Sequence, residues 1–426
     1  MFGFFKSQER KMRENAANWL EVAEKVYHFR RDVLPAAQVT ELQTEIGGLR
    51  GLLKERAGAE KLKLAIERLE ELLRRTGGAI YPKSALVENV EFFLVAAIVI
   101  LGIRTYFVQP FKIPTNSMWP TYNGMTPQVF PARDQEPGVA AQVGRFLAFG
   151  ARPRRVDAPA DGEVLIPLGF ERGRLPSQTV GDRTWLVIPT KVKEYTLYVG
   201  GEPARVRVPM DFDFEWAIRD AFFPNSTRPQ EPAATDLMRA AMRPGAVARG
   251  PDGQLYLRTG RQLKRGERLL SFDILTGDQL FVDRMSYHFI RPEVGSGFVF
   301  RTGNIPGLAA SFGDQYYIKR LVGVPGDTLE IRQPVLYRNG APITGSAAFD
   351  KNARQAGDYV GYRHQEGQLL SRGTDLTVGE DQYFALGDNS ANSLDGRYWG
   401  FVPAKDVVGR PIFVYFPFTK HWGPAK

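Results

Sequence analysis

The sequence predicts a mainly β protein that is held on one transmembrane helix and preceded by an α-helical region. Three observations lead to this prediction. Helical periodicity fills most of residues 9–75, one long apolar run occupies about 87–108, and short runs rich in Val, Ile, Tyr and Phe alternate with Gly and Pro after that point. We therefore expect a helical region at 1–86, a transmembrane helix at 87–108 and a β-rich remainder.

The composition narrows the possible chemistry. The chain contains no cysteine, which excludes a thiol nucleophile, a thiolate zinc site and disulfides. The net charge of +9 is modest for 426 residues, and no basic stripe with interleaved aromatics is present, so nucleic acid is not an expected partner. We expect no metal and no cofactor, because the histidines lack the spacing of metal ligands: His28, His288, His364 and His421.

Residues 1–86 combine two helical stretches. The first, 9–33, is rich in Glu, Lys, Arg and Ala and is followed by Pro35; the second covers 41–75. The second stretch has a heptad-like seam, in which apolar residues recur at 4-3-4 spacing: Leu42, Ile46, Leu49 and Leu53, then Leu62, Ile66, Leu69 and Leu73. The seam is either the inside of a helical hairpin that packs on itself, or a surface for self-association through a short coiled coil.

One apolar run is the candidate transmembrane helix. Its core, 92–103, has only 12 residues, but with Val90 and the tail at 106–108 it reaches about 19, within the range that crosses a bilayer. About 90 mostly polar residues precede it, which argues against a cleavable signal peptide. A buried core helix is the alternative. The positive-inside rule places 1–86 in the cytoplasm and 109–426 outside, because basic residues lie just before the run: Arg68, Arg74, Arg75 and Lys83.

The rest of the chain has an all-β pattern of many short strands. A stretch at 212–245 interrupts the pattern with expected helix and loop. Residues 123–270 are interpreted as an inserted β-rich subdomain. The clearest expected strands lie at 184–188, 194–199, 279–282, 315–319 and 411–416.

A candidate nucleophile follows the apolar run. Residues 109–121 read Gln-Pro-Phe-Lys-Ile-Pro-Thr-Asn-Ser-Met-Trp-Pro-Thr, so that Pro114 and Pro120 bracket a turn that can hold the Ser117 hydroxyl exposed. A serine hydroxyl is a poor nucleophile until a neighbouring base takes its proton. Taken alone, a serine in a proline-rich turn is most often just a turn residue.

A candidate base and a candidate site loop come later in the chain. Residues 317–327 read Tyr-Ile-Lys-Arg-Leu-Val-Gly-Val-Pro-Gly-Asp, a strand that ends in a tight turn and contains Lys319. A lysine in a strand is usually solvated, but a desolvated one can act as a base. Residues 385–403 place many turn formers and small polar groups between two apolar strands, which is typical of a structured site loop. On its own this loop is more simply interpreted as an Asp/Asn-rich turn or cation loop.

Taken together and in this order, these segments resemble the type I signal peptidases, also called leader peptidases. The resemblance extends from the apolar run to the C-terminus and includes two further segments, 277–282 and 408–418. It implies a signal-peptidase-like catalytic domain of coiled antiparallel sheets, built from 109–122 and 271–426. The insert at 123–270 is far longer than is typical of that family.

The resemblance also implies the roles of individual residues. Ser117 would be the nucleophile and Lys319 the general base of a Ser/Lys dyad. The backbone N–H of Ser117 and the hydroxyl of Thr115 would form the oxyanion hole. The remaining implied residues support the site: Ser393 would orient the Lys319 amine, and Asp395 would pair with Arg397.

Substrate and location are implied in the same way. Shallow pockets that accept small side chains match an Ala-x-Ala-like cleavage site, as in the signal peptides of exported preproteins. The enzyme would lie in the bacterial plasma membrane among its lipids, with the catalytic domain on the outer, periplasmic face. The pocket residues implied by the resemblance are Phe111, Ile113, Met118, Tyr317 and Ile318.

Two other functions remain as alternatives. A self-cleaving Ser/Lys protease of the SOS-repressor type shares the dyad, but the apolar run and the loop at 385–403 argue against it. A non-catalytic membrane-anchored scaffold or binding protein on the same fold is the alternative from another class. The presence of Ser117, Lys319 and Ser393 argues against that scaffold.

Overall fold

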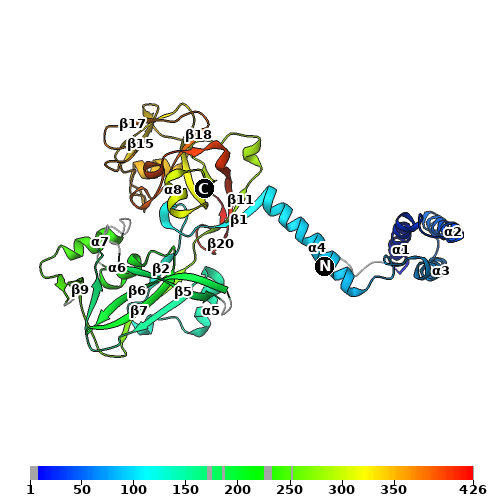
Figure 1. Ribbon diagram of the computed structural model, residues 1–426, viewed down its shortest axis with the longest axis horizontal. Coiled ribbons are helices and arrows are strands. Elements are labelled where there is room, and N and C mark those ends of the chain that lie inside the picture. The colour runs from blue at the N-terminus through cyan, green and yellow to red at the C-terminus, as the bar shows by residue number, and fades with distance from the viewer. Residues whose placement is uncertain (1–7, 170–174, 185–187, 225–232, 251–252, 426) are drawn as a thin grey trace. The chain divides into compact units, whose positions relative to one another are not determined.

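A computed structural model of the chain describes residues 8–169, 175–184, 188–224, 233–250 and 253–425. The chain divides into two compact units, Met1–Leu101 and Gly102–Lys426. The first is helical and the second is mainly β, as the ribbon drawing shows (Figure 1). Each unit is described separately below.

The N-terminal unit begins with a helical bundle of α1 (Gln8–Arg30), α2 (Ala36–Lys54) and α3 (Ala59–Thr76). The expected stretch at 41–75 is therefore broken into two helices: α2 ends at Lys54, and the chain turns through 55–58, where Arg56 has left-handed backbone (φ 55°), before α3 begins. The apolar residues of the seam are buried against one another and against Ala16, Ala23 and Val26 of α1. The seam is thus covered within one chain.

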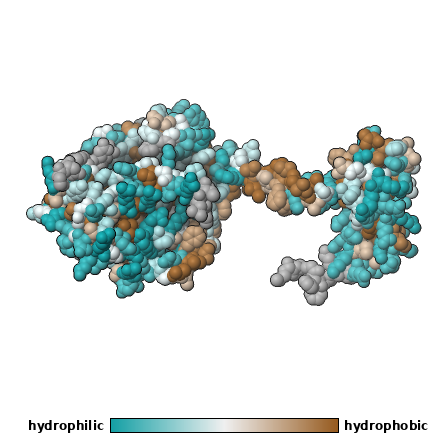
Figure 2. Space-filling view, turned by 60° about the horizontal axis from the view of Figure 1, so that its bottom comes forward, coloured by the Kyte–Doolittle hydropathy of each residue, from teal (hydrophilic) through white to brown (hydrophobic). Residues whose placement is uncertain are grey.

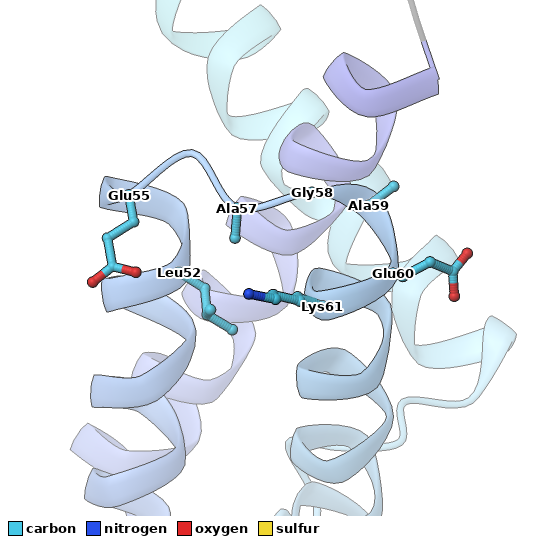
Figure 3. Close-up of a pocket in the computed structure, with 7 residues that line it drawn as sticks. All are labelled: Leu52, Glu55, Ala57, Gly58, Ala59, Glu60 and Lys61. Carbon is cyan, nitrogen blue, oxygen red and sulfur yellow. The ribbon is translucent and has the colours of Figure 1, made fainter.

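The turn between α2 and α3 leaves a shallow cavity of about 410 Å³. Figure 3 shows the Lys61 side chain extending from α3 toward Leu52 on α2, while Glu60 points away from the cavity. The cavity is open and has few apolar side chains in its lining, which gives it little capacity to hold a ligand.

The apolar run forms a continuous helix. It consists of α4 (Ala85–Gly102) and one further turn, η1 (Ile103–Phe107). Together they make 23 residues, which include an 18-residue window with a mean hydropathy of 2.2, and none of the 23 is buried. Among the described residues this is the helix long and apolar enough to cross a membrane. Its complete exposure argues against the alternative of a buried core helix.

The largest sheet of the β-rich unit is antiparallel throughout and has the strand order β1-β11-β20-β12-β13-β18-β19, with β21 paired to β20. The expected mainly β domain of antiparallel sheets is therefore confirmed. Its core lies on both sides of the sheet. The strands are β1 (Val108–Lys112), β11 (Gln279–Asp283), β12 (Gly297–Arg301), β13 (Tyr316–Gly323), β18 (Gln382–Leu386), β19 (Val402–Pro403), β20 (Val407–Phe416) and β21 (Gly423–Pro424).

A smaller antiparallel sheet and short helices complete this part of the unit. The sheet has the order β16-β15-β14-β17 and buries Leu329, Ile331 and Leu336 in a common core with β18. Its strands are β14 (Thr328–Arg332), β15 (Val335–Arg338), β16 (Ala341–Pro342) and β17 (Asp375–Thr377). The short helices are α8 (Pro306–Phe312), α9 (Ala347–Ala353), α10 (Gly396–Trp399), η4 (Ser286–His288), η5 (Ser390–Asn392) and η6 (Ala404–Asp406).

Separate sheets are built by residues 126–275, so the expected boundary of the insert at 270/271 falls inside the last of their strands, β10. One has the order β2-β10-β3, and the other has the order β5-β6-β4-β9-β8, with β7 paired to β6. Alternation is clear in β7, where Ala204, Val206 and Val208 point into the core and their neighbours point outward. The strands are β2 (Thr126–Val129), β3 (Arg152–Asp157), β4 (Gly162–Pro167), β5 (Ser177–Thr184), β6 (Ile188–Val199), β7 (Glu202–Pro209), β8 (Val247–Arg249), β9 (Leu255–Leu263) and β10 (Arg268–Leu275).

Helices occur in the same segment. The expected helix and loop at 212–245 contain α6 (Phe214–Phe222) and α7 (Ala233–Ala241). The helix α5 (Val139–Phe149) and the short turn η3 (Arg133–Gln135) were not expected. Most of the expected strand at 184–188 lies outside the described residues.

Candidate active site

The turn that contains Ser117 is closed by its own side chains. Ser117 lies in the short turn η2 (Asn116–Met118), four residues after β1. The buried Asn116 amide donates to the carbonyl of Met125 at 3.1 Å, and its oxygen accepts from the N–H of Gly124 at 2.9 Å. Gly124 is required here, since a Cβ at this position would lie 2.3 Å from the carbonyl carbon of Thr115. The turn therefore holds Ser117 in a fixed place.

Lys319 meets Ser117 from a central strand of the large sheet. It lies on β13 opposite Phe298 of β12, and it is only 4% exposed. Its Nζ lies 2.5 Å from Oγ of Ser117, across 202 positions of sequence. The structure thus brings the two predicted dyad residues into direct hydrogen-bond contact.

The surroundings of Lys319 disfavour its charged form. Burial of the amine lowers the pKa of Lys319 from 10.5 to about 8, and the guanidinium of Arg397 acts in the same direction. The carboxylates of Asp395 and Asp388 oppose this shift without cancelling it. An amine with such a pKa is partly neutral near neutral pH, so it can accept the proton of the hydroxyl beside it.

The loop after β18 packs directly on the serine turn. The N–H of Asn389 donates to the carbonyl of Ser117 at 3.1 Å, and the Asn389 side chain donates to the carbonyl of Asn116 at 3.0 Å. A Cβ at Gly387 would lie 2.4 Å from that same Ser117 carbonyl, so only glycine permits the close approach. The loop therefore fixes the backbone carbonyls of Asn116 and Ser117.

Asp395 and Arg397 form a buried bidentate ion pair. Nε of Arg397 lies 2.8 Å from Oδ1 of Asp395, and the second bond, from NH2 to Oδ2, is 2.9 Å. Both side chains are 0% exposed. Burial alone would raise the pKa of Asp395, but the guanidinium holds that pKa below its usual value. Arg397 also donates to the carbonyl of Ser390 and so closes the loop on itself.

The expected hydrogen bond between Ser393 and Lys319 is absent from the structure. Oγ of Ser393 is buried without a hydrogen-bond partner among the described residues. It lies against Gly387, where an added Cβ would approach it to 2.1 Å, and the amine of Lys319 is directed to Ser117 instead. The part of this prediction that concerns the contact is therefore not met.

The other predicted site residues lie at different depths. Thr115 is exposed beside the serine turn, with its side chain open to solvent. Phe111, Tyr317 and Ile318 are half-buried. Ile113 and Met118 are 3% and 0% exposed and pack in the core beneath the turn, so the structure gives Met118 no open surface.

A second buried ion pair was missed by the sequence analysis. Arg320 donates to both carboxylate oxygens of Asp388, at 2.7 and 2.5 Å, and the two side chains are 1% and 0% exposed. The hydroxyl of Thr121 also donates to Asp388, at 2.5 Å. These three residues join the lysine strand, the site loop and the serine turn. The signal available in the sequence was their position inside the three segments 109–121, 317–327 and 385–403.

Comparison with known proteins agrees with this arrangement. Residues 270–416 match the family model described as signal peptidase, peptidase S26. A signal peptidase I of Bacillus licheniformis is 33% identical over 145 residues, which are 34% of this chain and 70% of that protein. The chain belongs to the signal peptidase family. The matched residues of the family model include Lys319 and the site loop, whereas Ser117 lies before them.

Other members of the family match a similar part of the chain. A probable signal peptidase I-1 of Synechocystis sp. is 32% identical over 147 residues, which are 34% of this chain and 66% of that protein. The matched part covers less than two thirds of this and of two further signal peptidases, at 57% and 62% of their lengths. A solved signal peptidase I of Enterococcus faecalis is 31% identical and covers 28% of this chain and 97% of its own, with a TM-score of 0.21.

Proposed function

We propose that this protein is a membrane-bound serine endopeptidase that removes N-terminal signal peptides from exported preproteins, with Ser117 as nucleophile and Lys319 as general base. The observation that supports this best is the 2.5 Å contact between Nζ of the buried Lys319 and Oγ of Ser117. Membership of the signal peptidase family supports the choice of substrate.

The proposed reaction follows from that contact. The neutral Lys319 amine takes the hydroxyl proton while Oγ of Ser117 attacks the scissile carbonyl carbon, so that a C–O bond forms and a tetrahedral oxyanion develops. The resulting ammonium returns the proton to the leaving amine, the peptide C–N bond breaks, and an acyl-enzyme remains. Water then attacks the ester with Lys319 again as base, which frees Ser117. No cofactor enters this scheme.

The supporting residues have proposed roles of their own. The ion pair of Asp395 and Arg397 holds the site loop in place. Its two charges act on the pKa of Lys319 in opposite directions: Asp395 raises that pKa and Arg397 lowers it. Ser393 has the buried hydroxyl that an orienting contact with the amine would use. The substrate would lie along the half-buried side chains of Phe111, Tyr317 and Ile318, with the buried Ile113 and Met118 beneath.

Cleavage of a purified preprotein by the detergent-solubilised full chain tests the proposed function. We expect one cut after an Ala-x-Ala-like sequence, identified by sequencing the new N-terminus. Ser117→Ala should abolish the cut, and Ser177→Ala, at an exposed serine far from β13 in sequence, should not. Phe in place of the last Ala of the substrate should block cleavage, because a small pocket excludes a ring. An uncut preprotein would favour the non-catalytic scaffold.

Thr115 is the proposed side-chain donor of the oxyanion hole. Its exposed hydroxyl stands two residues before Ser117, on the same closed turn. Thr115→Ala should lower kcat by about 10²–10³-fold with little change in KM, because an oxyanion donor acts mainly in the transition state. Thr115→Ser keeps the hydroxyl and should retain most activity. A normal kcat for Thr115→Ala would leave the Ser117 N–H as the donor and remove Thr115 from the mechanism.

The orientation in the membrane is a further part of the proposal. The basic residues before α4, with the apolar helix Ala85–Phe107, support a cytoplasmic location for 1–86 and a periplasmic location for 109–426. Protease added outside intact spheroplasts should then digest the β-rich unit and spare the helical bundle. Digestion of the bundle with protection of the β-rich unit would reverse the orientation.

A further inference from the structure

The helix α5 has its apolar side turned outward. Its exposed residues are spaced on one helical face: Val139 is 79% exposed, Val143 55%, Phe146 44% and Leu147 65%. None of its residues is buried. An ordinary surface helix buries such a face against the core and exposes its polar residues. The helix lies in residues 123–270, which the family model does not match.

The polar side chains of α5 attach it to the protein. Arg145 donates to the carboxylate of Asp273 at 2.9 Å and to the side chain of Gln128 at 2.7 Å. Asp273 is 2% exposed and also pairs with Arg155 at 2.9 Å. The helix is therefore held in this inverted orientation by a largely buried ion pair, and its apolar face is presented outward by the fold itself.

Aromatic residues near the C-terminus extend the same surface. The N–H of Phe418 donates to the carbonyl of Ala148 in α5 at 3.0 Å, which places this segment beside the helix. Phe418 and Trp422 are 59% and 53% exposed. With the exposed residues of α5 they form what we call the apolar patch: Val139, Val143, Phe146, Leu147, Phe418 and Trp422. Figure 2 shows a compact hydrophobic area on the β-rich unit in the region where Figure 1 places α5.

Cations border the apolar patch. Arg152 begins β3 three residues after the end of α5, and it is exposed. Burial lowers the pKa of both Lys112 and Arg154, and the nearby Arg152 acts in the same direction on each, so Arg152 lies close enough to interact with both cations. One carboxylate opposes each shift, Asp211 at Lys112 and Asp182 at Arg154. An apolar surface rimmed by basic side chains is complementary to a bilayer with anionic headgroups. A second copy facing this patch through a two-fold axis would instead bring like charges together.

The position of the patch along the chain also favours a bilayer. The apolar helix Ala85–Phe107 is followed directly by β1, and Lys112 ends that strand. A five-residue strand covers about 16 Å, so the basic rim lies within that distance of the end of the apolar helix. The 11 residues of α5 make a helix of about 16 Å, too short to cross a membrane but long enough to lie in its surface.

We propose that α5, Phe418 and Trp422 lie in the headgroup layer of an anionic bilayer, with Lys112 and Arg152 against the lipid phosphates. This inference rests on the membrane-bound state in the proposed function. The contact would give the catalytic domain a second attachment to the membrane. The carbonyl of Phe149 accepts from the N–H of Thr276, and nearby Asp278 binds both ends of the serine turn, at Ile113 and Asn123. A lipid-bound α5 would thus fix the height of Ser117 above the bilayer.

Site-specific fluorescence in the full chain tests this inference, since the sequence has no cysteine to remove. Leu147→Cys and Val143→Cys are labelled with an environment-sensitive dye after reconstitution in phosphatidylcholine vesicles, with or without phosphatidylglycerol. Glu202→Cys, at the exposed first residue of β7, is the matched control. Brominated lipid should quench the dye at 143 and 147 at least about twofold more than at 202. Lys112→Gln with Arg152→Gln should reduce this difference only where phosphatidylglycerol is present.

Two results would overturn the inference. Equal quenching at 147 and 202 in both kinds of vesicle would mean that α5 stays in water. If the dye stays shielded from water in detergent, and this shielding increases with protein concentration, the apolar patch is instead covered by a second copy of the chain. The quenching needs no catalysis, and preprotein cleavage in detergent needs no vesicle. If the preprotein is cleaved but the dye at α5 is not quenched by lipid, only the membrane contact of α5 is rejected. If the dye is quenched but the preprotein is not cleaved, only the proposed peptidase activity is rejected.

Discussion

Replacing Lys319 by arginine is expected to lower kcat/KM for preprotein cleavage by at least about 10³-fold, because a guanidinium does not give up its proton and cannot accept one from Ser117. Lys319→Met should be equally inactive, since it removes the amine but keeps an apolar chain in a site that is 4% exposed. Lys351→Arg, at an exposed lysine on α9, is the matched control and should cleave normally. Normal cleavage by Lys319→Arg would refute the Ser/Lys mechanism.

The pH dependence should reveal the same amine. With a pKa of about 8, about one tenth of the Lys319 amines are neutral at pH 7, against roughly three in ten thousand for a lysine of pKa 10.5. The wild-type kcat/KM should therefore fall about tenfold per pH unit below pH 8 and level off above it. If kcat/KM instead begins to fall near the pKa of a solvated lysine, burial does not lower the pKa of Lys319.

Stability gives a measure of that pKa that is independent of activity. Between pH 8 and 10.5 the unfolded chain holds a proton on Lys319 that the folded chain has lost, so the free energy of unfolding should rise with pH in this window. Lys319→Met removes this contribution. The difference in stability between the two proteins should therefore change across the window and be constant below it.

The order of the motifs allowed the sequence to predict the dyad, and hydropathy allowed it to predict the apolar helix. Ser117 and Lys319 are 202 positions apart, so no local pattern could have shown that they meet. The resemblance of five ordered segments to one family implied that they do. The prediction for Ser393 was weaker because the hydrogen-bond partner of a serine hydroxyl depends on the rotamer of its own side chain, and in the structure this hydroxyl packs against Gly387.

Two features could not be predicted because they depend on what covers a surface. Alternation along a strand suggests that neighbours face opposite sides, one buried and one solvated, so Arg320 was not expected to be buried beside Lys319. The strand β13 is central in its sheet. Two of its consecutive residues, Leu321 and Val322, pack into different hydrophobic clusters, so both faces of the strand are covered. In α5 the apolar residues predict a buried face, and only the fold shows that Arg145 turns that face outward.

Breaking the ion pair between Arg320 and Asp388 is expected to cause the largest loss of stability among the predicted substitutions. Asp388→Ala should lower the free energy of unfolding by about 3–5 kcal/mol, because it leaves a guanidinium buried without its counter-charge. Arg320 is 1% exposed, and within the described part of the chain its guanidinium otherwise donates to two uncharged groups, the carbonyl of Gly295 and the hydroxyl of Thr121. The measurement is denaturant unfolding of the full chain in detergent, followed by tryptophan fluorescence.

An exposed pair provides the matched control for Asp388→Ala. Glu330 lies 2.6 Å from Arg332, with side chains 27% and 56% exposed, so Glu330→Ala should cost less than about 1 kcal/mol. The double variant Arg320→Met with Asp388→Leu removes both charges and should recover much of the lost stability, as apolar replacements of buried pairs often do. It should still cleave poorly, because Asp388 also accepts from Thr121 in the serine turn. If Asp388→Ala unfolds at the wild-type midpoint, the pair does not hold the three catalytic segments together, and the rigidity of the site must come from the Asn116 and Asn389 contacts alone.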